Sequence, residues 1–303
     1  MTLGGSQETY VLVGEEYLEA GCHAVDAEDG DITDKVDISG KVKTDKPGDY
    51  TITYKVKNSA RQKAVKQRTV HVVEKMDKNT KGIPVLMYHY VYTKDDKPDE
   101  LNSNWILDTE LEKQLKWLTD EGYYFPSYQE LRAWIDGKHS LPAKSAILTF
   151  DDGNAHFLKY GIPLLEKYKV PATSFIICDR DASAKNIIKY ASEYITFQSH
   201  SYGMHTAGTH QIGHSGKIYD LSAAEVKADQ EKCKKLLGTN EAFAYPYGDV
   251  SDVAPAALAE TGLLCAFTTE YGKCKIGADP MRLPRVRVQG DNSLEGYKAS
   301  VEN

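Results

Sequence analysis

Hydrophobic and polar residues alternate with a period of two in the first quarter of the chain. In the segment DYTITYKVKN, the side chains of Tyr50, Ile52, Tyr54 and Val56 share one face, while threonines and lysines occupy the other. This is the pattern of a strand with one buried side. The sequences EDGD and KPGD provide turns, TVHVVE adds another strand, and no helical periodicity is visible. The segment predicts a small immunoglobulin-like β-sandwich over residues 7–75.

The pattern changes after the polar segment KMDKNTKG, which we interpret as a linker at residues 76–83. From residue 84 onward, apolar runs alternate with helical segments. Short apolar runs of this kind are typical of parallel strands that are buried on both faces. The runs are IPVLMYH, SAILTF, ATSFIIC, YITFQSH, AFAY and LCAFT.

Two of the helical segments have recognisable ends. We expect one helix to begin after Asp108 as its N-cap and to stop at Gly122. Another should begin with Ser222 and Glu225 in capping-box spacing and end at Gly238. The buried stripe of the first helix is predicted to consist of Leu111, Leu115 and Leu118.

Strands that alternate with helices over about 200 residues predict an α/β fold, a complete or partial β/α barrel. We therefore expect this α/β domain to occupy residues 84–303, after the β-sandwich and its linker. The opening residues, MTLGGS, have the composition of a leader, so residues 1–6 are expected to lie outside both domains. No native export signal is visible in the sequence.

Composition narrows the possible partners. Hydrophobic residues make up 41% of the 303 residues, which is enough for a sizeable core. The net charge of −7 and the pI near 5.8 argue against nucleic acid or an anionic membrane as the main partner. No apolar stretch reaches the ~18 residues of a membrane-spanning helix. The five cysteines are scattered without a CxxC pair, which argues against a zinc ribbon and a dense disulfide framework, although Cys265 and Cys274 could face each other across a hairpin.

Four polar side chains lie at the ends of predicted strands: His89, Asp151, Asp152 and His200. In a parallel barrel the functional groups gather at the C-terminal ends of the strands. An Asp-Asp-Gly sequence after a strand is by itself typical of a turn. The joint placement of all four residues nevertheless favours a functional site at one rim of the barrel.

His200 and His205 are five residues apart in SHSYGMH. On a regular helix, five steps of ~100° would point the two rings ~140° apart, so a helix could not direct both to one ion. Gly203 permits an irregular turn that could do so. Two imidazoles and one carboxylate form a common ligand set for catalytic Zn²⁺. A bound cation would also explain how two adjacent aspartates stay ionised, one as ligand and the other as base toward a water molecule.

The segment HTAGTHQIGHSG contains two more histidines, His210 and His214, which could enlarge the metal cluster. Its glycine-rich, polar sequence favours a mobile rim instead. The tetrapeptide GHSG lacks the GxSxG spacing of a nucleophile elbow, which argues against a serine esterase.

Several of these motifs resemble those of the polysaccharide deacetylases, the NodB-homology domain of carbohydrate esterase family 4. The resemblance covers almost all of residues 84–290. The MYH sequence near the start of this region and the five-residue spacing of His200 and His205 most resemble those of the exported poly-N-acetylglucosamine deacetylases. The first domain resembles the immunoglobulin-like repeats of Gram-positive surface proteins, which implies an accessory module outside the cell. The deacetylase motifs are LTFDDG, SHSYGMH, FAYPYG, PVLMYHYV, LEKQLKWLTDEGY, LPAKSAILTFDDG, VPATSFII and LPRVRV.

The resemblance implies a role for each site residue. Asp151 would be the general base, and the backbone N–H of Tyr247, which follows Pro246, would form the oxyanion hole. The metal ligands would be Asp152, His200 and His205.

The sequence departs from the family pattern in an arginine. Many members have an arginine three residues before the tyrosine that corresponds to Tyr247, where it orients the base, but this chain has Ala244 there. Arg285 or Arg287, in LPRVRV, could supply the charge instead.

A second departure concerns the general acid. Many members have a histidine in a late motif, yet this chain has none after His214. His89 is the natural replacement, as in the exported branch that it resembles. The alternative interpretation is that His89 is a buried histidine with satisfied hydrogen bonds.

Together these features predict a metal-dependent amidase that removes acetyl groups from N-acetylglucosamine units of an extracellular or cell-wall polysaccharide. We expect Zn²⁺ in the site, although Co²⁺, Ni²⁺ and Fe²⁺ also suit the ligands. We further expect a monomer outside, or on the surface of, a Gram-positive-type bacterium. Two alternatives remain open: a catalytically inactive carbohydrate-binding or adhesion protein, and an O-acetyl esterase that acts on acetylated polysaccharide.

Overall fold

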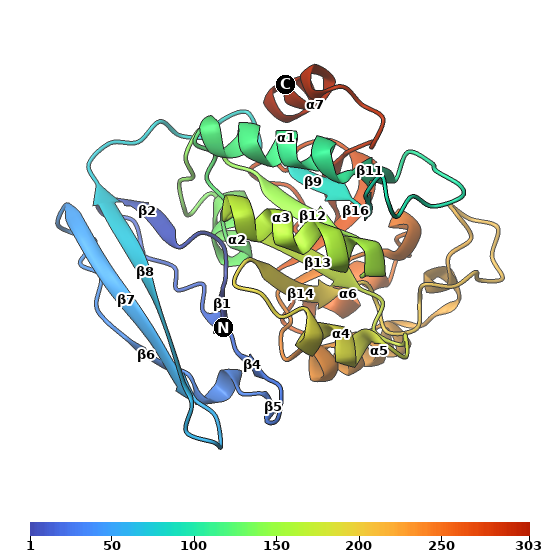
Figure 1. Cartoon of the computed structure of the whole chain (residues 1–303), viewed down its shortest axis with the longest axis horizontal. Coiled ribbons are helices and arrows are strands. Elements are labelled where there is room, and N and C mark those ends of the chain that lie inside the picture. The colour runs from blue at the N-terminus through green and yellow to red at the C-terminus, as the bar shows by residue number, and fades with distance from the viewer.

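The computed structural model describes all 303 residues and contains two domains that lie side by side (Figure 1). The larger domain is a closed barrel of seven parallel strands in the order β12-β13-β14-β15-β16-β17-β9, which confirms the predicted β/α barrel. Its strands are β9 (Val85–Tyr88), β12 (Ile147–Phe150), β13 (Ala172–Ile176), β14 (Ile195–Ser199), β15 (Ala242–Ala244), β16 (Cys265–Tyr271) and β17 (Leu283–Arg287).

Strand β17 closes the barrel by pairing with β9, with Val286 opposite Leu86. It was not among the six predicted strands because its sequence, LPRVR, contains two arginines and a proline instead of an apolar run. A short parallel pair, β10 (Tyr90–Tyr92) and β11 (Trp105–Leu107), lies beyond the end of β9.

Both helices whose ends were predicted are present. Helix α5 starts with the expected capping box of Ser222 and Glu225 and ends at Gly238, which has a φ of 68°. The prediction for Asp108 was wrong: it is the first residue of α1, and Leu107 is the N-cap, because strand β11 runs directly into the helix. The helices are α1 (Asp108–Asp120), α2 (Tyr128–Ile135), α3 (Ile162–Tyr168), α4 (Ser183–Lys189), α5 (Ala223–Leu237), α6 (Ala254–Ala259) and α7 (Leu294–Glu302), with short helical turns η2 (Phe157–Gly161), η3 (Lys217–Asp220) and η4 (Pro246–Gly248).

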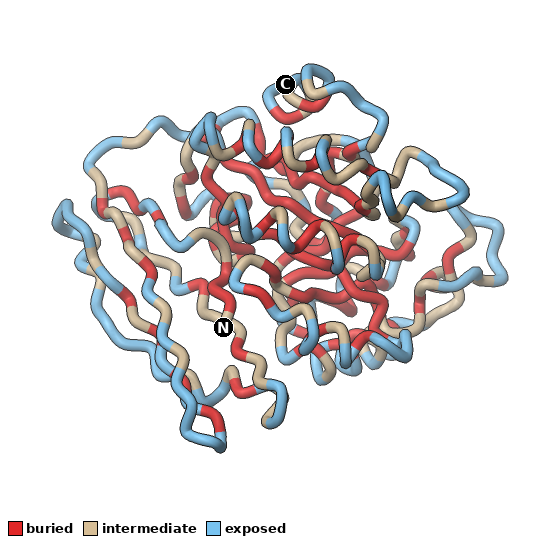
Figure 2. Tube along the Cα trace, viewed as in Figure 1, coloured by how far each residue is buried: buried red, intermediate tan, exposed pale blue.

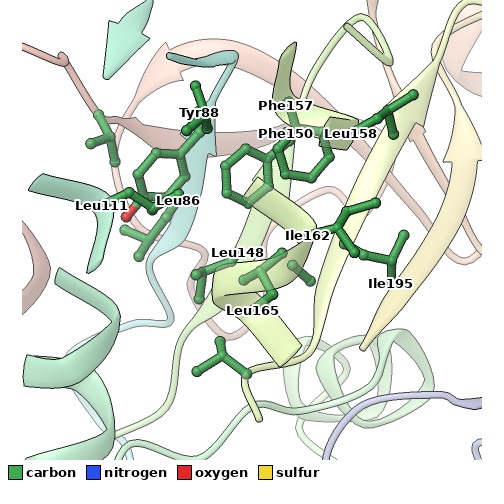
Figure 3. Packing of buried hydrophobic residues seen from close by; sticks show 14 of the residues in the cluster. Leu86, Tyr88, Leu111, Leu148, Phe150, Phe157, Leu158, Ile162, Leu165 and Ile195 are labelled. Atoms are coloured by element: carbon green, nitrogen blue, oxygen red, sulfur yellow. The ribbon is translucent and has the colours of Figure 1, made fainter. Parts of the chain in front are cut away.

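The largest hydrophobic core lies between the barrel and its surrounding helices (Figures 2 and 3). Tyr88, Phe150 and Phe157 stack on one another there, with ring centroids 4.8 and 4.0 Å apart. This packing fixes the last residues of β9 and β12, directly before the predicted site. The stripe of α1 is also buried here, as expected, and consists of Leu111, Leu115 and Leu118.

The N-terminal domain is built on a four-stranded sheet in the order β2-β8-β7-β6. The predicted alternation holds in β7, where Ile52, Tyr54 and Val56 are buried and Lys55 is exposed. Two short strand pairs accompany the sheet, and Leu3 from the first pair packs into its core. The strands are β1 (Thr2–Leu3), β2 (Glu8–Leu12), β3 (Cys22–His23), β4 (Val25–Asp26), β5 (Gly30–Asp31), β6 (Asp37–Ser39), β7 (Gly48–Lys57) and β8 (Lys63–Val73), and η1 (Thr33–Lys35) is a single helical turn.

Residues 1–6, which we expected to be a leader, lie in the junction between the domains. Strand β1 pairs with β3, and the Ser6 N–H donates to the Phe125 carbonyl at 2.9 Å. The buried guanidinium of Arg68 donates to the carbonyls of Gly4 and Ser6 at 2.8 and 2.5 Å, which ties this segment to the β-sheet. The predicted linker contacts the barrel domain, where the Asn79 N–H donates to the Leu141 carbonyl at 2.8 Å.

All five cysteine thiols are free, and Cys265 and Cys274 lie buried in the same core. None of the helices has the length and apolar character that a membrane span requires.

Candidate metal centre and active site

Strands β9, β12 and β14 bring the predicted site residues to one rim of the barrel. Phe150 is paired with Tyr88, so the residues that follow them, Asp151 and His89, leave the barrel side by side. The Asp151 N–H donates to the Tyr88 carbonyl at 3.0 Å. Strand β14 ends at the same rim, one residue before His200.

Asp152, His200 and His205 form a compact cluster of potential ligand atoms. The Nε2 atoms of both histidines lie 3.4 Å from Asp152 Oδ1. One ligand atom from each of the three residues lies within 4.8 Å of the others. Burial tends to raise the pKa of Asp152, but hydrogen bonds from the two histidines outweigh it and hold that pKa far below its usual range. The carboxylate is therefore ionised, as a metal ligand must be.

The contacts of His200 fit it for metal binding. Its Nδ1 lies 2.7 Å from the Ala244 carbonyl, which can only accept, so Nδ1 carries the proton and Nε2 faces Asp152. Burial lowers the pKa of His200, but the hydrogen bond to Asp152 and the nearby carboxylates raise it overall. A cation between these groups would take the place of that second proton. The three residues thus suit a divalent ion with nitrogen and oxygen ligands.

The turn that joins the two histidines is held in a way the sequence did not indicate. Ser201 adopts the left-handed conformation with a φ of 70°, whereas Gly203, the residue we expected to supply the irregular turn, does not. The carboxylate of Asp229, on α5, accepts the N–H groups of Tyr202 and Gly203, both at 2.7 Å. Asp229 therefore fixes the loop that carries both imidazoles.

Asp151 is paired with Arg285 of strand β17. Two guanidinium nitrogens contact the two carboxylate oxygens, each at 2.7 Å, and both side chains are buried. Arg285 also donates to the Thr268 carbonyl at 3.0 Å, whereas Arg287 turns away and donates to Asn104 at 2.6 Å. Burial tends to raise the pKa of Asp151, but the Arg285 charge outweighs it and lowers the pKa overall. Of the two candidate arginines, only Arg285 contacts Asp151.

His89 lies beside these carboxylates with an unsatisfied ring nitrogen. Its Nδ1 is buried and has no hydrogen-bond partner in the protein. Burial lowers the pKa of His89 more than the nearby charges of Asp151 and Asp152 raise it. A polar atom at this position could form a hydrogen bond with the Nδ1 of His89.

Tyr247 lies in the turn η4, after the buried Pro246, with a φ of 60°. Its side chain is exposed, and its ring centroid lies 4.6 Å from that of His205. Asp152, Ser201 and Tyr247 are three of the six non-glycine residues with positive φ in the whole chain. Such conformations cost of order 1–3 kcal/mol each and tend to persist at functional sites. The backbone is thus strained at three points around the proposed metal position.

His210 and His214 do not join the metal cluster. The imidazole of His210 contacts Asp220 at 2.5 Å, and that of His214 contacts Asp249 at 3.2 Å. Asp249 is buried and also accepts the N–H groups of His214 and Gly216, at 2.9 and 2.8 Å. The two aspartates thus hold the rim loop on either side of Gly213.

One contact to the cluster comes from a residue that sequence reasoning missed. The Tyr90 hydroxyl donates to Asp152 Oδ2 at 2.5 Å. Its position directly after His89 was visible in MYHYV, but nothing in the sequence indicated which side chain it would meet.

Family models match both domains. Residues 1–72 match the immunoglobulin-like domain of bacterial surface proteins, and residues 138–266 match the polysaccharide deacetylases. A poly-beta-1,6-N-acetyl-D-glucosamine N-deacetylase of Staphylococcus epidermidis is 27% identical over 231 residues, which cover 68% of this chain and 78% of that protein. Its counterpart in Staphylococcus aureus is 26% identical over 208 residues, covering 63% of this chain and 70% of that protein.

Solved structures share the fold. The Streptococcus pyogenes deacetylase PplD, in complex with acetate, aligns with a TM-score of 0.63 at 24% identity, covering 73% of this chain and 99% of that chain. IcaB from Ammonifex degensii aligns with a TM-score of 0.61 at 25% identity, covering 75% of this chain and 100% of that chain. The predicted family is confirmed: the chain combines an immunoglobulin-like domain of bacterial surface proteins with the NodB-homology domain of the polysaccharide deacetylases.

Proposed function

We propose that this protein is a metal-dependent deacetylase that hydrolyses the N-acetyl groups of N-acetylglucosamine units in an extracellular polysaccharide. The observation that carries the proposal is the cluster of Asp152, His200 and His205 directly beside the buried pair of Asp151 and Arg285. Because the Staphylococcus relatives are poly-β-1,6-N-acetylglucosamine deacetylases, we propose a β-1,6-linked polymer as the first substrate to test.

The metal we propose is Zn²⁺, held by Asp152, His200 and His205, and Co²⁺, Ni²⁺ and Fe²⁺ are alternatives for the same ligands. When bound, such an ion polarises a carbonyl oxygen and makes water more acidic. Side chains and backbone groups of this chain supply the general base, the hydrogen bond to the oxyanion and the general acid.

Asp151 is proposed as the general base. Its ionised carboxylate accepts a proton from the water that attacks the acetyl carbonyl, and Arg285 holds it in one orientation through two hydrogen bonds. Both carboxylate oxygens keep a further lone pair for that proton. Arg285 thereby replaces the arginine that many family members have at the position of Ala244.

The backbone N–H of Tyr247 is proposed to donate to the oxygen that becomes negative when water adds to the carbonyl. His89 is proposed to protonate the amine nitrogen as the C–N bond breaks. Burial lowers the pKa of His89, so its protonated form gives up the proton more readily. Donation leaves it neutral, the state that its buried surroundings favour.

We further propose that the protein acts outside the cell or on the cell surface of a Gram-positive-type bacterium, as a monomer. The match of its first domain to bacterial surface proteins supports that location.

Acetate release tests the proposal directly. The purified protein, loaded with Zn²⁺, would be incubated with poly-β-1,6-N-acetylglucosamine, chitin oligomers, peptidoglycan and acetyl-xylan, with Asp151→Asn as the control. We expect release from an N-acetylglucosamine substrate that the control lacks. Release from acetyl-xylan alone would favour an O-acetyl esterase, and polymer binding without release would favour an adhesion protein.

A further inference from the structure

Tyr90 is held in place beside the metal cluster by a short strand pair. It lies on β10, paired with Trp105 on β11, and its N–H donates to the Asn104 carbonyl at 3.1 Å. Its ring centroid lies 4.7 Å from that of Trp105. The phenol is therefore restrained by the backbone on one side and by an aromatic ring on the other.

The two oxygens of Asp152 have different partners. Oδ2 accepts the hydroxyl of Tyr90 at 2.5 Å, whereas Oδ1 lies 3.4 Å from Nε2 of both His200 and His205. Only Oδ1 faces the point where the three ligand atoms converge. A short hydrogen bond to a carboxylate is a strong one, so the hydroxyl opposes rotation of the carboxylate about its Cβ–Cγ bond.

We propose that Tyr90 is a positioning residue that restricts Asp152 to a single ligating oxygen. The inference rests on the metal site of the proposed function. A carboxylate can bind a cation through one oxygen or through both, and binding through both would occupy a position that the water and the acetyl oxygen need. By engaging Oδ2, the Tyr90 hydroxyl keeps that oxygen away from the ion and fixes the direction of Oδ1.

A hydrogen bond to a metal ligand also contributes to metal affinity. Loss of such an outer contact typically weakens metal binding by ~10–100-fold. Without the hydroxyl, the partly buried Oδ2 would lose its donor, and the side chain of Asp152 would have one restraint fewer.

Zn²⁺ binding to the full chain tests the inference without any substrate. The comparison is between wild type, Tyr90→Phe and Tyr92→Phe. Tyr92 is a matched control because it lies on the same strand and also packs edge-on against Trp105, with ring centroids 6.4 Å apart. The hydroxyl that reaches Asp152 is that of Tyr90. Competition with a chromophoric chelator gives the dissociation constant, and a thermal melt of each metal-free protein shows that the variants are folded.

We expect Tyr90→Phe to bind Zn²⁺ about 10–100-fold more weakly than wild type, and Tyr92→Phe to bind within about twofold of it. With Co²⁺ in the site, Tyr90→Phe should also show weaker visible absorption bands, because a second carboxylate oxygen raises the coordination number. Equal affinity in Tyr90→Phe and wild type, or unchanged Co²⁺ bands, would overturn the role of Tyr90 while leaving the proposed function intact. A wild-type protein that binds no metal would overturn both.

Discussion

Arg285 and Asp151, 134 residues apart in the chain, form a bidentate ion pair in the interior of the barrel. Neither side chain is exposed by more than 3%. The pair joins β17 to the end of β12, and because both strands pair with β9, Arg285 reaches past that one strand to the base. The pair therefore contributes both to the closed barrel and to the orientation of the proposed general base.

Replacing Arg285 by methionine should destabilise the protein and abolish turnover. A buried pair that loses one partner leaves an uncompensated charge, which typically costs ~3–5 kcal/mol. Urea unfolding measures the loss, and acetate release measures the activity. Arg287→Met is the matched control, because that guanidinium contacts Asn104 instead. Equal effects of the two substitutions would contradict a special role for Arg285.

Substitution of the predicted ligands should remove the metal, whereas substitution of the predicted base should not. We expect Asp152→Ala, His200→Ala and His205→Ala each to lose bound metal while keeping the fold, because each supplies one atom of the cluster. Asp151→Asn should keep its metal and lose turnover. His210→Ala is a suitable control, since that imidazole contacts Asp220. Elemental analysis after dialysis, together with a thermal melt, gives the answer, and stoichiometric metal in all three ligand variants would disprove the assignment.

The stability of the N-terminal domain should depend on pH through His71. Burial tends to lower the pKa of His71, but hydrogen bonds to Asp49 and Glu8, both at 2.7 Å, raise it overall. The protonated histidine therefore stabilises the fold fully below the pKa of ~6.5 that it has when unfolded. That contribution disappears as the pH rises through the higher pKa of the folded state.

The variant His71→Gln tests this dependence by urea unfolding. At pH 5 we expect the free energy of unfolding of wild type to exceed that of the variant by up to ~1 kcal/mol. The difference is small because the imidazole of His71 is partly exposed to solvent. The difference should shrink at pH 9. A difference that is the same at both pH values would show that the ion pairs of His71 do not contribute.

Removal of residues 1–80 should affect stability more than catalysis. The N-terminal domain contacts the barrel where its strands begin, through bonds such as that of Ser6 to Phe125, whereas the site lies where the strands end. We therefore expect kcat on a short soluble oligomer to change by less than about tenfold, with a lower melting temperature because the junction becomes exposed to water. A larger fall in kcat would mean that the first domain contributes to the active site.

The sequence predicted those parts of the site that depend on local pattern. Apolar runs end at His89, Asp151 and His200, and the barrel fold places such strand ends together. The contact between Arg285 and Asp151 could be proposed only as one of two options, because it depends on how β17 enters the barrel. The contact of Asp229 with the histidine loop gave no local signal at all.

Two local predictions failed for conformational reasons. Gly203 was expected to make the irregular turn because glycine accepts a left-handed φ at little cost, yet Ser201 adopts it. The partly buried hydrogen bonds that Asp229 of α5 accepts from this turn compensate for the strain, and no local pattern indicated them. Likewise, Asp108 is not the N-cap of α1, because the preceding strand extends through Leu107 and the helix begins at Asp108 itself.

His89 gives the prediction that discriminates best between catalysis and structure. An amide C–N bond breaks readily only if the nitrogen is protonated as it leaves, and a general acid typically contributes ~10²–10⁴-fold. His89 has a buried Nδ1 without a partner and lies beside the proposed base. His89→Ala should therefore lower kcat on an N-acetyl amide by roughly 10²–10⁴-fold with its metal content unchanged. On an activated aryl acetate, whose phenolate leaves without a proton, the loss should be much smaller. An equal loss on both substrates would indicate a collapsed pocket, and no loss on either would leave His89 with a structural role only.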